Sequence, residues 1–103
     1  MTQSRSGTSH APVTISNIRF VAAGPDDVAT GLLGYVSAVL NGALRLDGLA
    51  LRRTAEGRLT LSFPFRRDHA GNQCFYLRPL NDIARQEIEH QVFQALVLEG
   101  GVR

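Results

Sequence analysis

The sequence has very little cysteine. Cys74 is the only cysteine among 103 residues, so an internal disulfide is excluded. The three histidines, His10, His69 and His90, are scattered along the chain. Together with Cys74 they give none of the short spacings that zinc ligands need. We therefore expect neither a metal site nor a cofactor.

Motifs that carry catalysis are also missing. The chain has no Walker-type phosphate loop, no GxGxxG and no carboxylate pair at a spacing that suits acid–base chemistry. Cys74 and His69 are the one thiol and imidazole close in sequence, which is the chemistry of a nucleophile and its base. No orienting third group or glycine-flanked elbow accompanies them. We therefore expect a protein that is not an enzyme and binds no small-molecule substrate, with Cys74 inert on a strand.

Long apolar runs are absent as well. No run approaches the roughly 20 residues that cross a bilayer, and the first residues, MTQSRSGTSHAPVT, lack the apolar stretch of a secretory signal. We expect a cytoplasmic protein without membrane association. The polar composition of residues 1–12 predicts a disordered tail, and residues 100–103 form a short C-terminal tail. One domain is expected between them, over 13–99.

The chain contains no lysine. All 11 basic residues are arginine, against 9 acidic residues, for a net charge of +2. The planar guanidinium grips phosphate or carboxylate in two places, which an ammonium does not. A genome that favours arginine codons would give the same bias without any binding site. The positions of the arginines therefore matter more than their number.

Hydropathy in the first half of the domain predicts a meander of strands. The apolar parity changes within residues 13–22, which indicates a strand with an irregularity near Ser16 and Asn17. Residues 24–27 break it. Residues 31–40 are apolar on both parities, as in a strand covered on both faces. Asn41-Gly42 predicts a hairpin through a type I′ turn. The returning strand covers 43–53, with a bulge predicted at Asp47-Gly48.

The second half predicts one more long strand, a loop, a short strand and a helix. Leu59 to Phe65 alternate apolar and polar residues, and Pro64 marks an edge or an end. A polar loop covers 66–73 and a short strand 74–78. The C-terminal helix covers 82–99, after an N-cap at Asn81. Its expected core stripe consists of Ala84, Ile88, Val92, Ala95 and Leu96. The fold class is α+β, an antiparallel sheet of four to five strands covered by one C-terminal helix.

The C-terminal helix is apolar in a second direction too. Phe93 and Val97 lie away from the core stripe, with His90 and Gln86 beside them. A helix at a partner interface has this pattern. Because a chain of this length has a small core, pairing with a second copy is an easy way to bury more apolar surface.

Arginines gather around the predicted polar loop. Arg66 and Arg67 lie in it, Arg78 follows the next strand, and Arg85 lies in the first turns of the helix. If that strand returns antiparallel, the loop lies at one of its ends and Arg78 and Arg85 at the other. The four then need not form one pocket, although they can still line one face. Several cations near a helix N-terminus suit a phosphate-binding surface. The same residues also fit an ordinary solvated face, with Arg85 paired to Asp82, Glu87 or Glu89 and Arg67 paired to Asp68. A second pair, Arg52 and Arg53, is equally ambiguous.

Two aromatic residues adjoin this basic region. Phe75 and Tyr76 beside Arg78 suit a platform on which bases of a single strand stack. Phe75 also suits the core. Tyr76 and Tyr35 each suit either a wet face of the sheet or a contact surface.

The chain resembles the SpoVG family of bacterial septation and regulatory proteins over about residues 13–98. The resemblance lies in Ile15 to Phe20 (ISNIRF), Phe63 to Arg67 (FPFRR), Gly71, Arg78 to Asn81 (RPLN) and Arg85. The sequence departs from that family in having arginine at positions 66 and 78, where lysine and histidine are usual. It is also apolar from Cys74 to Leu77.

The resemblance implies a small α+β fold, a homodimer, and binding of DNA and RNA in gene regulation, with a role in division septum formation in some bacteria. The expected nucleic-acid contacts are Arg66, Arg67, Arg78 and Arg85, extended by Arg52 and Arg53. The alternative is a homodimeric protein-interaction module without nucleic-acid binding, docking through Phe93, Val97 and His90.

Overall fold

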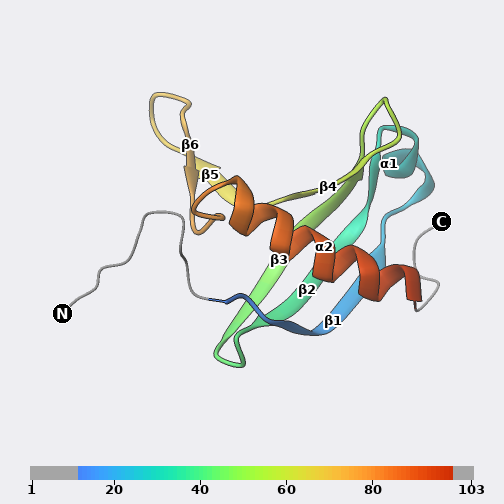
Figure 1. Cartoon of the computed structure of the whole chain (residues 1–103). Helices are drawn as coiled ribbons and strands as arrows, with labels where there is room; N and C mark the ends of the chain where they lie inside the picture. Colours follow the sequence, from blue (N-terminus) through green and yellow to red (C-terminus); the bar gives the residue numbers. More distant parts are fainter. Residues whose placement is uncertain (1–11, 99–103) are drawn as a thin grey trace.

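Four antiparallel strands form one twisted sheet in a simple meander. They are β1 (Ile15–Ala22), β2 (Leu32–Leu40), β3 (Leu44–Arg53) and β4 (Leu59–Ser62), hydrogen-bonded in the order β1-β2-β3-β4. In this computed structural model, which describes residues 12–98, helix α2 (Asp82–Leu98) lies across one face of the sheet (Figure 1). The predicted α+β class is confirmed. The expected tails, residues 1–12 and 100–103, lie outside the described residues except for Pro12.

A second, smaller sheet stands apart from the first. Strands β5 (Phe65–Arg67) and β6 (Gln73–Phe75) form a two-stranded hairpin near the start of α2. Figure 1 shows this hairpin and the β3–β4 turn at opposite ends of the molecule. The hairpin was expected in part as a loop, and the last strand was placed too late, at 74–78. The strand predicted from Leu59 to Phe65 ends at Ser62, two residues before Pro64, and the chain leaves the main sheet before it pairs again in β5.

The turn between β2 and β3 follows from its two residues. Asn41 has φ of 52° and Gly42 has φ of 65°, as a type I′ turn requires. The N–H of Ala43 donates to the carbonyl of Leu40 at 2.9 Å, which closes the turn. The Asn41 side chain also accepts the N–H of Thr14 at 2.7 Å. The predicted hairpin is confirmed.

Both predicted irregularities are present. The register between β1 and β2 shifts between Ser16 and Arg19, where Asn17 has φ of 50°. The register between β2 and β3 shifts opposite Gly48, whose φ is 74°. Each bulge inserts a residue, so the apolar side chains on both sides of it return to the core face.

A short helix, α1 (Pro25–Ala29), occupies the stretch that was predicted only as a break. Proline at the first helical positions and the acids Asp26 and Asp27 in the first turn both favour a helix start. Gly31, with φ of 103°, then turns the chain into β2.

The core lies between α2 and one face of the sheet. Four of the five expected stripe residues, Ala84, Ile88, Val92 and Leu96, are buried, and Ala95 is half-buried. The sheet contributes buried apolar residues from all four strands: Ile15, Val36, Ala38, Leu46, Leu49, Leu51 and Leu61. Strand β2 is covered on this face only. Tyr35, on its other face, is 48% exposed, which corrects the expectation of two covered faces.

Helix α2 begins as predicted. The side-chain oxygen of Asn81 accepts the N–H of Ala84 at 2.9 Å, which satisfies one of the donors that the first turn leaves free. None of the described helices is long and apolar enough to span a membrane.

Candidate nucleic-acid interface

The β5–β6 hairpin is closed by its own loop. The N–H of Asp68 donates to the carbonyl of Asn72, and the N–H of Gly71 to the carbonyl of Asp68, both at 3.0 Å. The Asp68 carboxylate accepts the N–H groups of Ala70 and Asn72, both at 2.9 Å. Gly71 has φ of 85°, which a side chain would disfavour. The loop is therefore an ordered turn that sets the register of the two strands.

The backbone N–H of Asn72, and then that of Ala70, lower the pKa of the Asp68 carboxyl below its ordinary value of 3.8. These N–H groups donate to the ionised form and so favour it, although desolvation of the carboxyl opposes part of the effect. The loop is thus best ordered when Asp68 is charged.

Alternation along the hairpin separates two sets of side chains. Phe65 pairs with Phe75, and Arg67 with Gln73, on one face. Arg66 pairs with Cys74 and therefore lies on the other face. Arg66 and Arg67 were expected in a loop. They lie instead on β5, and because successive residues of a strand alternate, they point to opposite sides of the hairpin.

Three arginines lie over three phenylalanine rings at the base of this hairpin. The guanidinium carbon of Arg67 is 5.4 Å from the ring centre of Phe65, and that of Arg78 is 5.2 Å from Phe75. The guanidinium carbon of Arg85 is 5.9 Å from the ring centre of Phe63. The rings of Phe65 and Phe75 also touch, with centres 5.5 Å apart and planes tilted by 59°. We call these six residues the arginine–phenylalanine cluster.

Cation–π contacts of this kind fix the position of a guanidinium without neutralising it. Arg67 has one further tie, because its Nη1 donates to the carbonyl of Gly71 at 2.9 Å. Both Arg67 and Arg78 are exposed. Their guanidinium groups are therefore charged, oriented and open to an anion. A hollow of about 260 Å³ is lined by the three phenylalanines of the cluster, by Arg85 and by neighbouring residues of β4 and the hairpin.

Arg85 is held differently from the other two arginines. Its Nη1 donates to the carbonyl of Leu61 at 3.0 Å and lies 3.3 Å from the Glu89 carboxylate. The same carboxylate accepts the N–H of Leu61 at 3.1 Å. Arg85 thus fastens α2 to β4, and fewer of its donors are free for an outside anion. The predicted pairing with Glu89 is present.

The arginines Arg52 and Arg53 lie far from the cluster. They end β3 beside the β3–β4 turn, at the other end of the molecule from the hairpin. Arg52 is exposed, whereas Arg53 is half-buried and donates to the carbonyl of Gly57 at 3.5 Å. The structure therefore brings Arg67, Arg78 and Arg85 together, and separates them from this pair.

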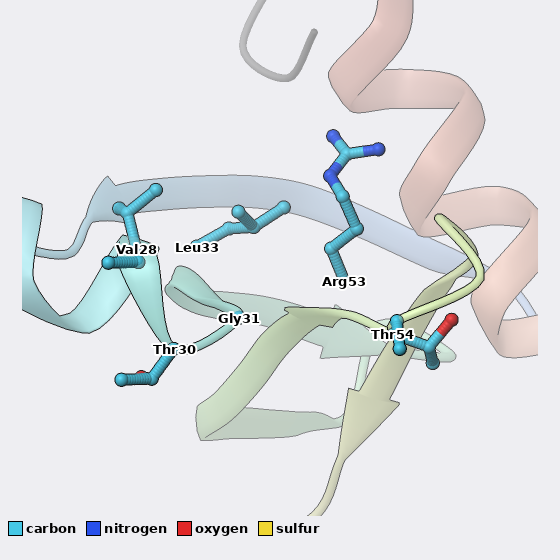
Figure 2. A pocket seen from close by; sticks show the side chains of 8 residues that line it. Val28, Thr30, Gly31, Leu33, Arg53 and Thr54 are labelled. Carbon is cyan, nitrogen blue, oxygen red and sulfur yellow. The ribbon is translucent and has the colours of Figure 1, made fainter.

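Arg53 borders a different hollow, of about 450 Å³, between the α1–β2 connection and the end of β3. Figure 2 shows that the hydroxyl groups of Thr30 and Thr54 do not converge on its guanidinium. Thr30 donates to the carbonyl of Asp27, and Thr54 accepts the N–H of Arg58. The polar groups here serve the neighbouring turns and offer no convergent site.

Cys74 and His69, the residues considered as a nucleophile and its base, lie on β6 and in the hairpin loop. Cys74 is half-buried on β6, and its Sγ lies 3.9 Å from the carbonyl of Asn72. His69 is exposed in the hairpin loop. Within residues 12–98 no three metal-ligating side chains gather in one place.

The expected interface on α2 is partly core. Phe93 is half-buried and packs against the core, whereas His90 is exposed and Val97 is 60% exposed. These three residues and Gln94 line a shallow hollow of about 390 Å³.

Phe65 and Phe63 were not among the predicted site residues. The alternation from Leu59 to Phe65 assigned both rings to the core, but Phe65 is 39% exposed. Pro64 between two phenylalanines, followed by two arginines, was the signal available in the sequence. Comparison of the chain with protein-family models and with curated proteins finds no match.

Proposed function

We propose that this chain is a nucleic-acid-binding regulatory protein of the SpoVG type that acts without catalysis. The observation that carries the proposal is the pair of arginines, Arg67 and Arg78, held over the touching rings of Phe65 and Phe75. Two exposed guanidinium groups, each held over one of two touching rings, suit the binding of phosphate groups.

The rings improve these arginines as phosphate ligands. A free arginine side chain loses considerable rotamer freedom when it binds an anion. Arg67 and Arg78 are already restrained by the rings, so less freedom remains to be lost on binding. Each retains several N–H donors with which to contact phosphate oxygens.

Arg66 widens the surface to the other face of the hairpin. It is exposed on β5, opposite Cys74 in the ladder. A strand of nucleic acid that passes the tip of the hairpin would meet Arg66 on one side and Arg67 on the other. Contacts of this kind are to the backbone and give affinity without sequence preference.

The resemblance to SpoVG proteins supports the same function. It rests on segments that include Phe63 to Arg67 and Arg78 to Asn81, and these segments supply most of the arginine–phenylalanine cluster. We extend the proposal to a homodimer that acts in the cytoplasm on DNA or RNA, with a link to cell division as its most specific part.

The test is a salt series with labelled duplex DNA and single-stranded RNA. Arg66→Gln/Arg67→Gln should lower affinity for all sequences and flatten the slope of log K against log salt by about one to two. The matched control is Arg58→Gln, which removes an exposed charge beside the β3–β4 turn and should leave the slope nearly unchanged. An unchanged slope in the double variant would overturn the proposal.

A second candidate function is the docking of a protein partner on α2. The exposure of Val97, which lines a hollow together with His90 and Phe93, favours it. An apolar side chain in such a position suits a contact with a second copy of the chain.

A further inference from the structure

The face of the main sheet opposite α2 carries exposed apolar, aromatic and arginine side chains. Val21 on β1 is 68% exposed and Tyr35 on β2 is 48% exposed, and the two are directly paired across the strands. On the other side, Tyr35 pairs with Ala50 of β3. A small side chain on that side leaves the tyrosine ring room to accept a contact.

Two arginines flank Tyr35 on this face. Arg19 precedes Val21 by two residues on β1, and Arg52 follows Ala50 by two residues on β3. Arg19 is therefore a diagonal neighbour of Tyr35, at about 7–8 Å between backbone positions. Arg52 lies on the opposite diagonal, beyond a register shift between Leu32 and Gly34 of β2. The three side chains form a line across three strands, with a cation at each end and a ring in the middle. Both arginines are exposed.

The charge on this face is mostly positive. Arg45, which pairs with Val39, adds a third exposed guanidinium farther along β3. Within residues 12–98, Arg19, Arg45 and Arg52 take part in no ion pair. The carboxylates nearest along the chain are Asp47, at the β3 bulge, Glu56, in the β3–β4 turn, and those of α1 before β2. A second copy stacked on this face would bring arginines against arginines, which disfavours self-association here.

We propose that this face binds single-stranded nucleic acid along the line Arg19, Tyr35, Arg52. In a single strand each base branches from the sugar between two phosphates, so a base stacked on Tyr35 has a phosphate on either side of it for Arg19 and Arg52 to contact. Its bases are free to stack on a tyrosine, whereas those of a duplex are already stacked. The inference rests on the proposed function, because it adds a second surface that binds nucleic acid. It also specifies that this surface binds the single-stranded form.

The test uses an oligo(dT) strand of 12 nucleotides and a mixed-sequence duplex of 12 base pairs. Tyr35→Ala and Arg19→Gln/Arg52→Gln should each weaken oligo(dT) binding by about tenfold or more, with little effect on the duplex. Tyr35→Phe keeps the ring and should bind nearly as the wild type does. Asp47→Asn should strengthen binding slightly, because it removes a carboxylate from the face.

Fluorescence gives a direct readout of the ring. The chain has no tryptophan and two tyrosines, so Tyr76→Phe leaves Tyr35 as the only emitter. Oligo(dT) should quench this emission at saturation, because a stacked base lies against the ring. If emission is unchanged while the oligonucleotide is fully bound, the inference is wrong. It is also wrong if inorganic polyphosphate or polyglutamate of the same charge binds as tightly and Tyr35→Ala has no effect.

The two surfaces can fail separately. If Arg66→Gln/Arg67→Gln abolishes all binding and the Arg19 and Arg52 variant changes nothing, the proposed function stands and this inference falls. If only the sheet-face variants lose oligo(dT), the inference stands and the hairpin is not the site. Circular dichroism of every variant excludes unfolding as the cause.

Discussion

Glu89 on α2 accepts the backbone N–H of Leu61 on β4 at 3.1 Å, while Arg85, one turn earlier, donates to the carbonyl of the same residue at 3.0 Å. Leu61 lies on an edge strand, where unpaired backbone groups invite another chain to pair. The two side chains occupy those groups as a neighbouring strand would.

The first prediction concerns this link. Glu89→Ala should lower the free energy of unfolding by about 1–2 kcal/mol, because it leaves the N–H of Leu61 without its acceptor. Glu89→Gln should cost less, since its amide oxygen still accepts. Urea denaturation measures both, with Glu56→Gln in the exposed β3–β4 turn as the control. Equal stability of the alanine variant and the wild type would show that the contact contributes nothing.

At the other edge of the sheet, a side chain of α2 likewise hydrogen-bonds to the backbone at β1. The Gln91 amide donates to the carbonyl of Val13 at 2.7 Å and accepts the N–H of Ile15 at 2.8 Å. One side chain thus meets both a donor and an acceptor of the backbone at β1. Helix α2 therefore covers both outer strands with polar side chains as well as the core with its apolar stripe.

The second prediction concerns the hairpin loop and pH. Since the folded pKa of Asp68 lies below its ordinary value of 3.8, the stabilisation of the loop is complete above 3.8. It is lost as pH falls through the lower folded pKa. The amide resonances of Ala70 and Asn72 should report this loss, and Asp68→Asn should abolish the pH dependence. A carboxyl of Asp68 that titrates at or above 3.8 would contradict the account.

The third prediction concerns the contact between β1 and β2 at Gly34. A Cβ there would collide with the carbonyl oxygen of Val21 and lie 2.7 Å from ring atoms of Phe20. Gly34→Ala should therefore destabilise the chain by about 1–3 kcal/mol, because backbone cannot give way easily. Gly24→Ser is the control in thermal denaturation, because a Cβ there meets nothing within 4 Å and serine suits the N-cap of α1. A neutral Gly34→Ala would mean that β1 sits farther from β2.

The fourth prediction separates the helix surface from the hairpin. Val97→Glu should lower the mass of the protein in solution if two copies meet through α2, because it buries a charge in the contact. Phe93→Glu is less informative, since Phe93 also packs against the core. Gln86→Glu, exposed outside the hollow, controls for added charge. A mass unchanged by Val97→Glu would remove the helix from any interface.

Local chemistry made much of the fold predictable. Asn41-Gly42 determined a turn because few residues tolerate positive φ, and Asn81 determined a helix start because its side chain caps an N–H. The position of Phe65 was not predictable in this way. Its alternation with Leu61 and Phe63 suits a continuous strand, and only the tertiary path after Pro64 takes it out of the core.

The sequence predicted the arginines of the candidate site but not the contribution of Phe63 and Phe65. Arg67 and Arg78 were expected to lie at opposite ends of a strand. The short β6 lets Phe75 touch Phe65 instead, and each ring then holds one arginine. Contacts between residues that are distant in sequence decide such a pairing, and periodicity does not report them. The same holds for Arg52, which the sheet places beside Tyr35.

The most direct measurement of the central claim is side-chain NMR of the arginine Nε–H groups during titration with a short duplex and a short single strand at low salt. The account predicts that the signals of Arg67 and Arg78 shift with both ligands and return as salt is added, while Arg58 stays in place. Signals of Arg67 and Arg78 that remain unchanged while nucleic acid is bound would contradict it.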